Sequence, residues 1–84
     1  MPYTINRYNG SVVTTVADGT VDTTTDLKLI GKNYAGYGEI QNENLVFMLE
    51  NFASNNGPNN PVTGQLWYDT ANGRMRFWDG SKYR

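Results

Sequence analysis

The segment from Gly64 to Gly80 constrains the fold of this chain more than any other part of it. It contains two short runs rich in aromatic residues, Leu66–Asp69 and Arg74–Trp78, on either side of a polar turn. This pattern predicts an antiparallel β-hairpin over about residues 65–79. Because the sequence stops at Arg84, where a further strand is expected to start, we expect a module that continues into, or docks on, another protein segment.

A four-residue loop over 70–73 predicts the register of this hairpin. Four residues then share the face expected to cover the core, namely Leu66, Tyr68, Met75 and Phe77. The opposite face is expected to be the outer one, with a Trp67–Arg76 cation–π contact and an Asp69–Arg74 ion pair. A three-residue loop with a bulge at Gly73 is the alternative, and it shifts the register by one residue.

The length and composition of the chain limit how it can be stabilised. Its 84 residues allow one domain, and domains of this size bury only about 60% of their unfolded surface. The chain has no cysteine and no histidine, which removes disulfides and the commonest metal ligands and general bases. Association with other chains is the remaining source of extra stability.

Charge and hydropathy argue against nucleic-acid and membrane partners. The net charge is −1, too small for a polyelectrolyte. No run approaches the roughly 20 apolar residues of a membrane span, and the first residues lack a signal-peptide pattern. Basic and aromatic residues do alternate over 74–84, but Asp79 interrupts them, and an ordinary hairpin face has the same pattern.

The first 31 residues are predicted to be β-rich. Asn9-Gly10 is typical of a tight hairpin turn between strands over 3–8 and 11–17. Asp18-Gly19 repeats the turn chemistry, and a short strand is expected over 27–30. The stretch 20–25 is either an edge strand or a loop.

One amphipathic helix is predicted over about residues 39–54. A stripe of apolar residues at helical spacing is expected to be buried on a sheet, namely Leu45, Met48, Leu49 and Phe52. Asn55–Pro58 is expected to end the helix. Ile40 and Phe47 lie almost opposite the stripe, which indicates either a second neighbour or a loop folded over Phe47.

The predicted fold class is therefore α+β, with a β-rich segment over 1–31, a loop and helix over 32–57, and a hairpin segment over 58–84. The whole of 1–84 forms a single small domain or the amino-terminal module of a longer protein.

No catalytic, metal or cofactor site is predicted. Asp18, Asp22 and Asp26 are spaced by four residues, which does not match a calcium loop. The glycines of 31–38 do not have the order of a phosphate-binding loop. Glu43 and Glu50 share a helix face but both are expected in solvent, and the chain is small for an enzymatic cleft. We therefore do not expect an enzyme.

Three blocks of the sequence resemble virion structural proteins of large tailed bacteriophages. These blocks are Leu29–Gly38, Glu43-Asn44 running into Leu49–Ala53, and Pro61–Asp69 followed by Trp-Asp-Gly. The opening Met-Pro-Tyr-Thr-Ile and the threonine-rich strand after it also resemble the start of tail-fibre proteins in that family. The resemblance extends over nearly the full length.

The resemblance implies a structural role in a virion, in a tail fibre or a related tail, baseplate or neck component assembled in the host cytoplasm. Its implied partners are other virion proteins and copies of itself, and trimers are usual for phage fibres. The interface candidates are aromatic, apolar and arginine residues, which are common interface anchors: Tyr34, Tyr37, Ile40, Phe47, Trp67, Arg76 and Trp78. The two tyrosines and the two tryptophans could instead fill the core of their own chain.

A carbohydrate-binding module is the alternative function. Flat aromatic rings beside Asn and Asp are what sugar recognition uses, and a phage fibre could contact a host glycan. The same residues also describe the core of a hairpin.

Overall fold

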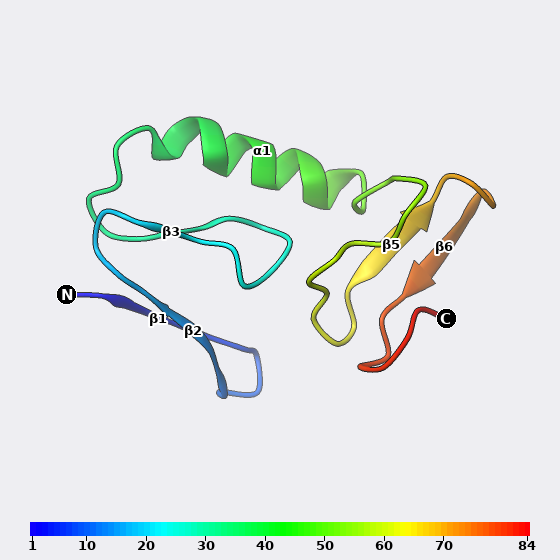
Figure 1. The fold of residues 1–84 in the computed structure, drawn as a ribbon, viewed down its shortest axis with the longest axis horizontal. Helices are drawn as coiled ribbons and strands as arrows, with labels where there is room; N and C mark the ends of the chain where they lie inside the picture. The colour runs from blue at the N-terminus through cyan, green and yellow to red at the C-terminus, as the bar shows by residue number, and fades with distance from the viewer.

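Three two-stranded antiparallel sheets and one helix make up the fold, which is α+β as predicted. The computed structural model describes all residues from 1 to 84. The helix lies across the top of the view in Figure 1, above the amino-terminal strands at one end and beside the carboxyl-terminal hairpin at the other. The elements are β1 (Tyr3–Asn6), β2 (Val12–Val16), β3 (Val21–Asp22), β4 (Leu29–Ile30), α1 (Tyr37–Leu49), β5 (Leu66–Asp69) and β6 (Arg74–Phe77).

The amino-terminal hairpin forms around the predicted Asn-Gly turn. β1 pairs with β2, and the register shifts between Ile5 and Asn6. Gly10 has a φ of 92°, a left-handed conformation that glycine adopts without strain, and the Asn9 side chain accepts a hydrogen bond from the Ser11 N–H. β3 then pairs with β4. Residues 21–22 are therefore a short strand within the stretch 20–25, for which the sequence allowed either an edge strand or a loop.

Helix α1 ends five residues earlier than predicted. Asn51 adopts a left-handed φ of 53°, and the Phe52 N–H donates to the Phe47 carbonyl while the Asn51 N–H donates to that of Met48. This pair of bonds is a Schellman motif with asparagine in the left-handed position. The prediction of a helix to residue 54 is therefore wrong at its end, because Asn51 stops it before Asn55–Pro58.

The residues after the helix join β5 instead. The Tyr68 N–H donates to the Asn51 carbonyl, and the Ser54 N–H donates to the Tyr68 carbonyl, at a parallel bridge between Ser54 and Asp69. These bonds give β5 a neighbour on the side away from β6.

The carboxyl-terminal hairpin has the register predicted from the four-residue loop. Asp69 pairs with Arg74 and Trp67 with Arg76. The other two pairs are Tyr68 with Met75 and Leu66 with Phe77. The assignment of its faces, however, is wrong. Trp67 and Asp69 are buried, at 7% and 2% exposure, whereas the residues expected in the core are partly exposed, namely Leu66, Tyr68, Met75 and Phe77.

A cluster of aromatic rings explains why the Trp67 face turns inward. The Tyr83 ring lies 4.9 Å from the ring of Trp67 and 4.9 Å from that of Trp78. The Tyr83 hydroxyl donates to the Pro58 carbonyl at 2.8 Å, and a Cβ added at Gly57 would lie 2.5 Å from the Tyr83 ring. The chain near its carboxyl end therefore covers the Trp67 face together with the Gly57–Pro58 loop.

The buried carboxylate of Asp69 is satisfied by the turn that it organises. One of its oxygens accepts the N–H groups of Ala71 and Asn72, and the other accepts the Asn72 side chain and Arg76 Nε at 2.9 Å. A buried charge is tolerated when it is paired and hydrogen-bonded in this way. The ion pair thus joins Asp69 to Arg76, rather than to Arg74 as predicted.

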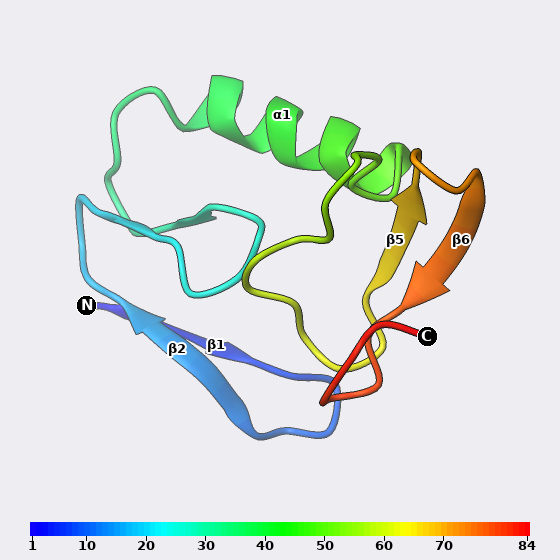
Figure 2. The same cartoon turned by 45° about the vertical axis from the view of Figure 1, so that its right-hand side comes forward.

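The molecule is open and flat. Its extents are 43 × 28 × 17 Å and its radius of gyration is 13.9 Å, compared with about 12 Å for a compact domain of this length. Its accessible surface is 5761 Å², compared with about 5,000 Å² for a monomer of this mass. Val16 and Trp67 are the apolar residues of the core. Figure 2 shows the amino-terminal strands and the carboxyl-terminal hairpin at opposite sides of the molecule, with the helix above them.

Side chains from distant parts of the sequence join the elements. The Asn44 side chain on α1 accepts the Lys28 N–H at 3.1 Å and donates to the Lys28 carbonyl at 2.8 Å. The Asp26 carboxylate accepts the Asn60 N–H at 3.0 Å and the Gln65 side-chain amide at 3.1 Å. These bonds tie the helix, the amino-terminal strands and the hairpin segment to one another.

Candidate interaction surfaces

The first candidate surface is the exposed face of the carboxyl-terminal hairpin. The pairing of β5 with β6 places Leu66 opposite Phe77 and Tyr68 opposite Met75, so the four side chains adjoin one another. Each is between 37% and 46% exposed, and none of the four carries a charge. We call this surface, Leu66, Tyr68, Met75 and Phe77, the outer hairpin face.

The second candidate surface lies on the helix. Leu45, Met48 and Leu49 fall at i, i+3 and i+4, and all three are exposed, Leu49 to 84%. We call these three residues the helix stripe. The prediction that they are buried is wrong, since α1 has no buried residue.

Another side of the helix faces the strands. Asn44 and Met48 line hollows together with residues of β1 and β4. Ile40 and Phe47 are half-buried, and Phe47 lines a further hollow together with residues of the loop that follows the helix. The two hydrogen bonds between Asn44 and Lys28 fix this orientation of the helix.

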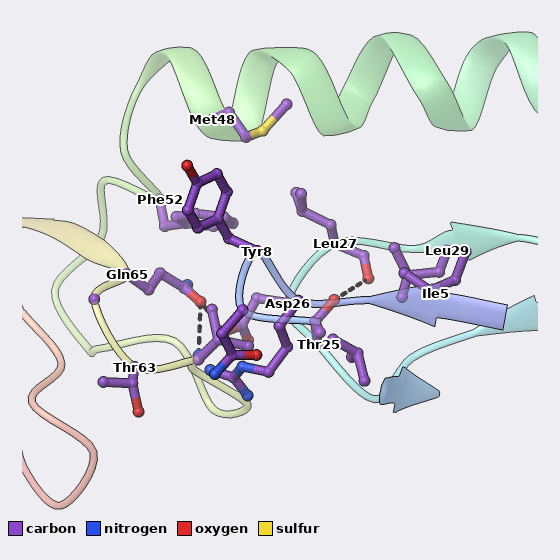
Figure 3. A pocket seen from close by; sticks show the side chains of 15 residues that line it. Ile5, Tyr8, Thr25, Asp26, Leu27, Leu29, Met48, Phe52, Thr63 and Gln65 are labelled. Atoms are coloured by element: carbon purple, nitrogen blue, oxygen red, sulfur yellow. Dashed lines mark hydrogen bonds between the residues drawn. The ribbon is translucent and has the colours of Figure 1, made fainter. Parts of the chain in front are cut away.

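A groove opens between the helix and the amino-terminal hairpin (Figure 3). It has a volume of about 700 Å³. Its apolar lining includes Ile5, Val13, Leu27, Leu29, Met48 and Phe52. We call it the central groove. Met48 belongs to both the groove and the helix stripe, so these two surfaces are continuous.

Polar groups are present at one end of the central groove. Arg7 lines the groove and forms no ion pair, while the Gln65 side-chain amide donates a hydrogen bond to the Asp26 carboxylate. Figure 3 shows Gln65 and Asp26 beneath Tyr8 and Phe52. This volume and this mainly apolar lining are typical of sites that take up an apolar group.

The predicted interface residues do not form one surface. Tyr34 and Tyr37 line a smaller hollow together with Tyr3 and Lys28. Trp67 is buried under Arg76, whose guanidinium lies 5.9 Å from the ring centroid, and Trp78 is half-buried against Tyr83. Of the seven candidates, only Tyr37 has an exposed side chain.

The positions of the tryptophans also bear on the carbohydrate hypothesis. A sugar-binding platform needs the flat face of an aromatic ring open to solvent, whereas Trp67 is buried and Trp78 is half-buried. The exposed rings belong instead to tyrosines and to Phe77.

The three aspartates that prompted the calcium hypothesis point to separate partners. Asp18 pairs with the terminal amine of Met1 at 2.9 Å, Asp22 accepts from Thr14 and Thr24, and Asp26 accepts from Asn60 and Gln65. The hydrogen bonds from Thr24 and Thr14 lower the pKa of Asp22. No three acidic side chains of the chain come close enough together to hold a metal ion.

The last turn is organised by Asp79. Its carboxylate accepts the Ser81 and Lys82 N–H groups at 2.8 Å and pairs with Arg84. The hydrogen bond from Lys82, with those from Arg84 and Ser81, lowers the pKa of Asp79 to about 2. Arg84 also exchanges two backbone hydrogen bonds with Phe77, which extends the pairing along the free edge of β6.

The sequence did not identify the residues whose hydrogen bonds hold these surfaces in place. Asn44 and Asp26 have no local signal, because their partners lie 16 or more residues away. Asn51 did carry a signal, since asparagine is the second choice after glycine for ending a helix.

Comparison of the chain with protein-family models, with curated proteins and with solved structures found no match. Helix α1, with 13 residues, does not have the length and hydropathy of a membrane span.

Proposed function

We propose that this chain is an assembly module of a tailed-phage virion, acting through contacts with copies of itself and with other virion proteins. The observation that carries the proposal is the exposed apolar area. The outer hairpin face and the helix stripe hold seven large apolar side chains in solvent, while the apolar core consists of Val16 and Trp67. Exposed apolar patches of this kind mark protein–protein contact sites.

The extended shape supports the same function. A flat molecule with little core gains stability when a partner covers its surface, because binding to the folded state alone stabilises it. The proposal places the chain in the virion, in a tail fibre or a related tail, baseplate or neck part.

The phage part of the proposal rests on the sequence blocks that resemble virion proteins. Three of the four buried residues lie in these blocks, namely Gly31, Trp67 and Asp69. Gly31 has no room for a side chain, since a Cβ there would lie 2.2 Å from the Ala17 carbonyl oxygen. The blocks that resemble virion proteins therefore include residues that maintain the fold of this chain.

Light scattering on the purified chain tests the proposal. We expect a folded oligomer, with a trimer as the favoured state, at micromolar concentration. A cooperatively unfolding monomer at that concentration, which also fails to bind the other structural proteins of its virion, would overturn it.

A further inference from the structure

We infer that the chain associates head to tail, with the outer hairpin face of one copy seated on the central groove and helix stripe of the next. This inference rests on the proposed function and specifies the contact. Two kinds of apolar surface are present on one molecule, and they differ in shape. One is the face of a two-stranded sheet, and the other is a groove with an apolar rim.

The chemistry of the two surfaces matches. The outer hairpin face presents two aliphatic and two aromatic side chains without a charge. The apolar part of the central groove is lined mainly by aliphatic side chains and Phe52, with Arg7 and Asp26 among its polar residues, and the helix stripe extends the apolar lining over its rim through Met48. Contact between them removes apolar atoms from water on both sides without burying a charge from the hairpin face.

The area is sufficient for a specific interface. With roughly 200 Å² for each side chain of this size, the exposed fractions leave about 350 Å² on the outer hairpin face and a similar area on the helix stripe. Apolar atoms make up about 57% of a typical interface. Covering both surfaces therefore corresponds to roughly 1,200 Å² in total, the lower end of the range for stable complexes, before the groove lining is added.

A single symmetric contact leaves more apolar surface exposed than a closed head-to-tail ring does. Two outer hairpin faces packed together leave the groove and the helix stripe in water on both copies, and two helix stripes leave both hairpins in water. One head-to-tail contact covers a surface of each kind. The pair as a whole then still has one free hairpin face and one free groove, so further copies add until the ring closes.

A mixing experiment separates the two arrangements. The first variant, Leu66→Thr with Phe77→Thr, removes apolar area from the outer hairpin face and keeps residues that favour strands. The second, Met48→Lys, places a charge in the groove near the end of a helix, where a cation is tolerated. The matched controls are Val12→Thr on β2 and Val46→Lys on α1, since both positions are exposed and lie outside the two surfaces.

We expect each surface variant to be monomeric in light scattering and both controls to keep the mass of the native oligomer. An equimolar mixture of the two surface variants should form a dimer of one copy each, because one intact face and one intact groove remain. A mixture that stays monomeric overturns the head-to-tail contact but leaves an oligomeric assembly module in place. A native chain that is monomeric also overturns the head-to-tail contact, and the proposed function then depends on binding to other virion proteins alone.

Cross-linking gives a second test that does not depend on disruptive variants. The native chain has no cysteine, so Met48→Cys and Met75→Cys each introduce a unique thiol. Under mild oxidation, the mixture of the two should give several times more disulfide-linked dimer than either variant alone. Dominant self-linking of the Met75→Cys variant would instead show that two outer hairpin faces meet, and would overturn the inference.

Discussion

At the scale of single residues, the fold depends on a few side chains with several partners each. Asp69 accepts four hydrogen bonds, and Tyr83 contacts both tryptophans while bonding to Pro58. Burial and the nearby charge of Asp26 raise the pKa of Tyr83, so its hydroxyl stays a donor at neutral pH. With so small a core, the loss of one such residue removes a large share of the stability.

Trp67 provides a test at this scale. Its indole Nε1–H is buried without a hydrogen-bond partner. We expect Trp67→Ala to lower the free energy of unfolding by about 3–5 kcal/mol, as for other large aromatic residues removed from a core. Trp67→Phe should cost less than about 2 kcal/mol, because it keeps a ring against Tyr83 and removes an unsatisfied donor.

Urea denaturation measures both losses. A Trp67→Phe variant as unstable as Trp67→Ala would contradict the expectation that a ring against Tyr83 provides most of the stabilisation.

Asp79 predicts a pH dependence. Its pKa in the folded chain is about 2, below the ordinary value of 3.8, so the unfolded chain takes up a proton first as the pH falls. The stabilising effect of its ionised form is therefore present above about pH 4 and is lost as the pH falls towards 2. The lowered pKa values of Asp22 and Asp69 act in the same direction.

Thermal melts from pH 6 to pH 2 check this expectation, with Asp79→Asn as the comparison. The amide keeps an acceptor for the Ser81 and Lys82 N–H groups but loses the charge that pairs with Arg84. The melting temperature of the variant should fall less over this range. An equal fall in both proteins would count against a role for Asp79.

At the scale of elements, the core is too small to fix how the elements are arranged. Close backbone approaches and hydrogen bonds from polar side chains position them instead. Asn44 attaches α1 to the backbone of Lys28, next to β4, and thereby selects which side of the helix faces inward. The Schellman motif then turns the chain at Asn51 so that residues 51–54 lie beside β5. The helix and the carboxyl-terminal hairpin are held together by this backbone connection and not by a shared core.

A substitution at Gly31, directly after β4, tests how closely the backbone there approaches the turn at residues 17–20. Its N–H donates to the Thr20 carbonyl, and a Cβ at this position would meet the backbone oxygens of Ala17 and Thr20. We expect Gly31→Ala to cost about 1–3 kcal/mol, as overpacking does, because backbone atoms must move.

Gly38 is the matched control. It lies inside α1, and a Cβ there would contact nothing within 4 Å. Gly38→Ala should stabilise the helix by about 0.5–1 kcal/mol. Chemical denaturation compares the two, and a Gly31→Ala variant as stable as the native chain would contradict the close packing.

At the scale of the whole molecule, the balance between core and surface is the unusual property. The chain has a larger radius and more accessible surface than a compact monomer of its size, and its large apolar residues are mostly on the outside. We therefore regard a complete core as something formed between chains. Under the proposed function, the amphipathic patterns in the sequence correspond to surfaces for association.

A concentration dependence of stability follows from this view. If oligomers form only from folded chains, dilution should lower the melting temperature, because mass action then favours the unfolded monomer. Circular dichroism melts over a hundredfold range of protein concentration measure the effect. The Leu66→Thr, Phe77→Thr variant should show no such dependence, and a native melting temperature independent of concentration would contradict the proposal.

The sequence alone determined the local structure of this protein. Turn residues act over a few positions, so Asn9-Gly10 and the four-residue loop after Asp69 were enough to predict both hairpins and the register of β5 with β6. The existence of one helix in the middle of the chain followed from local periodicity in the same way.

Only the tertiary structure decided which faces lie inside. Pairing places residues on two faces but does not say which face another segment will cover. On the hairpin that choice was made by Tyr83 and the Gly57–Pro58 loop, and on the helix by Asn44 with Lys28. These contacts join positions 16 or more residues apart along the chain, and no local pattern encodes them. Both apolar stripes read from the sequence consequently lie on the outside, where a partner can cover them.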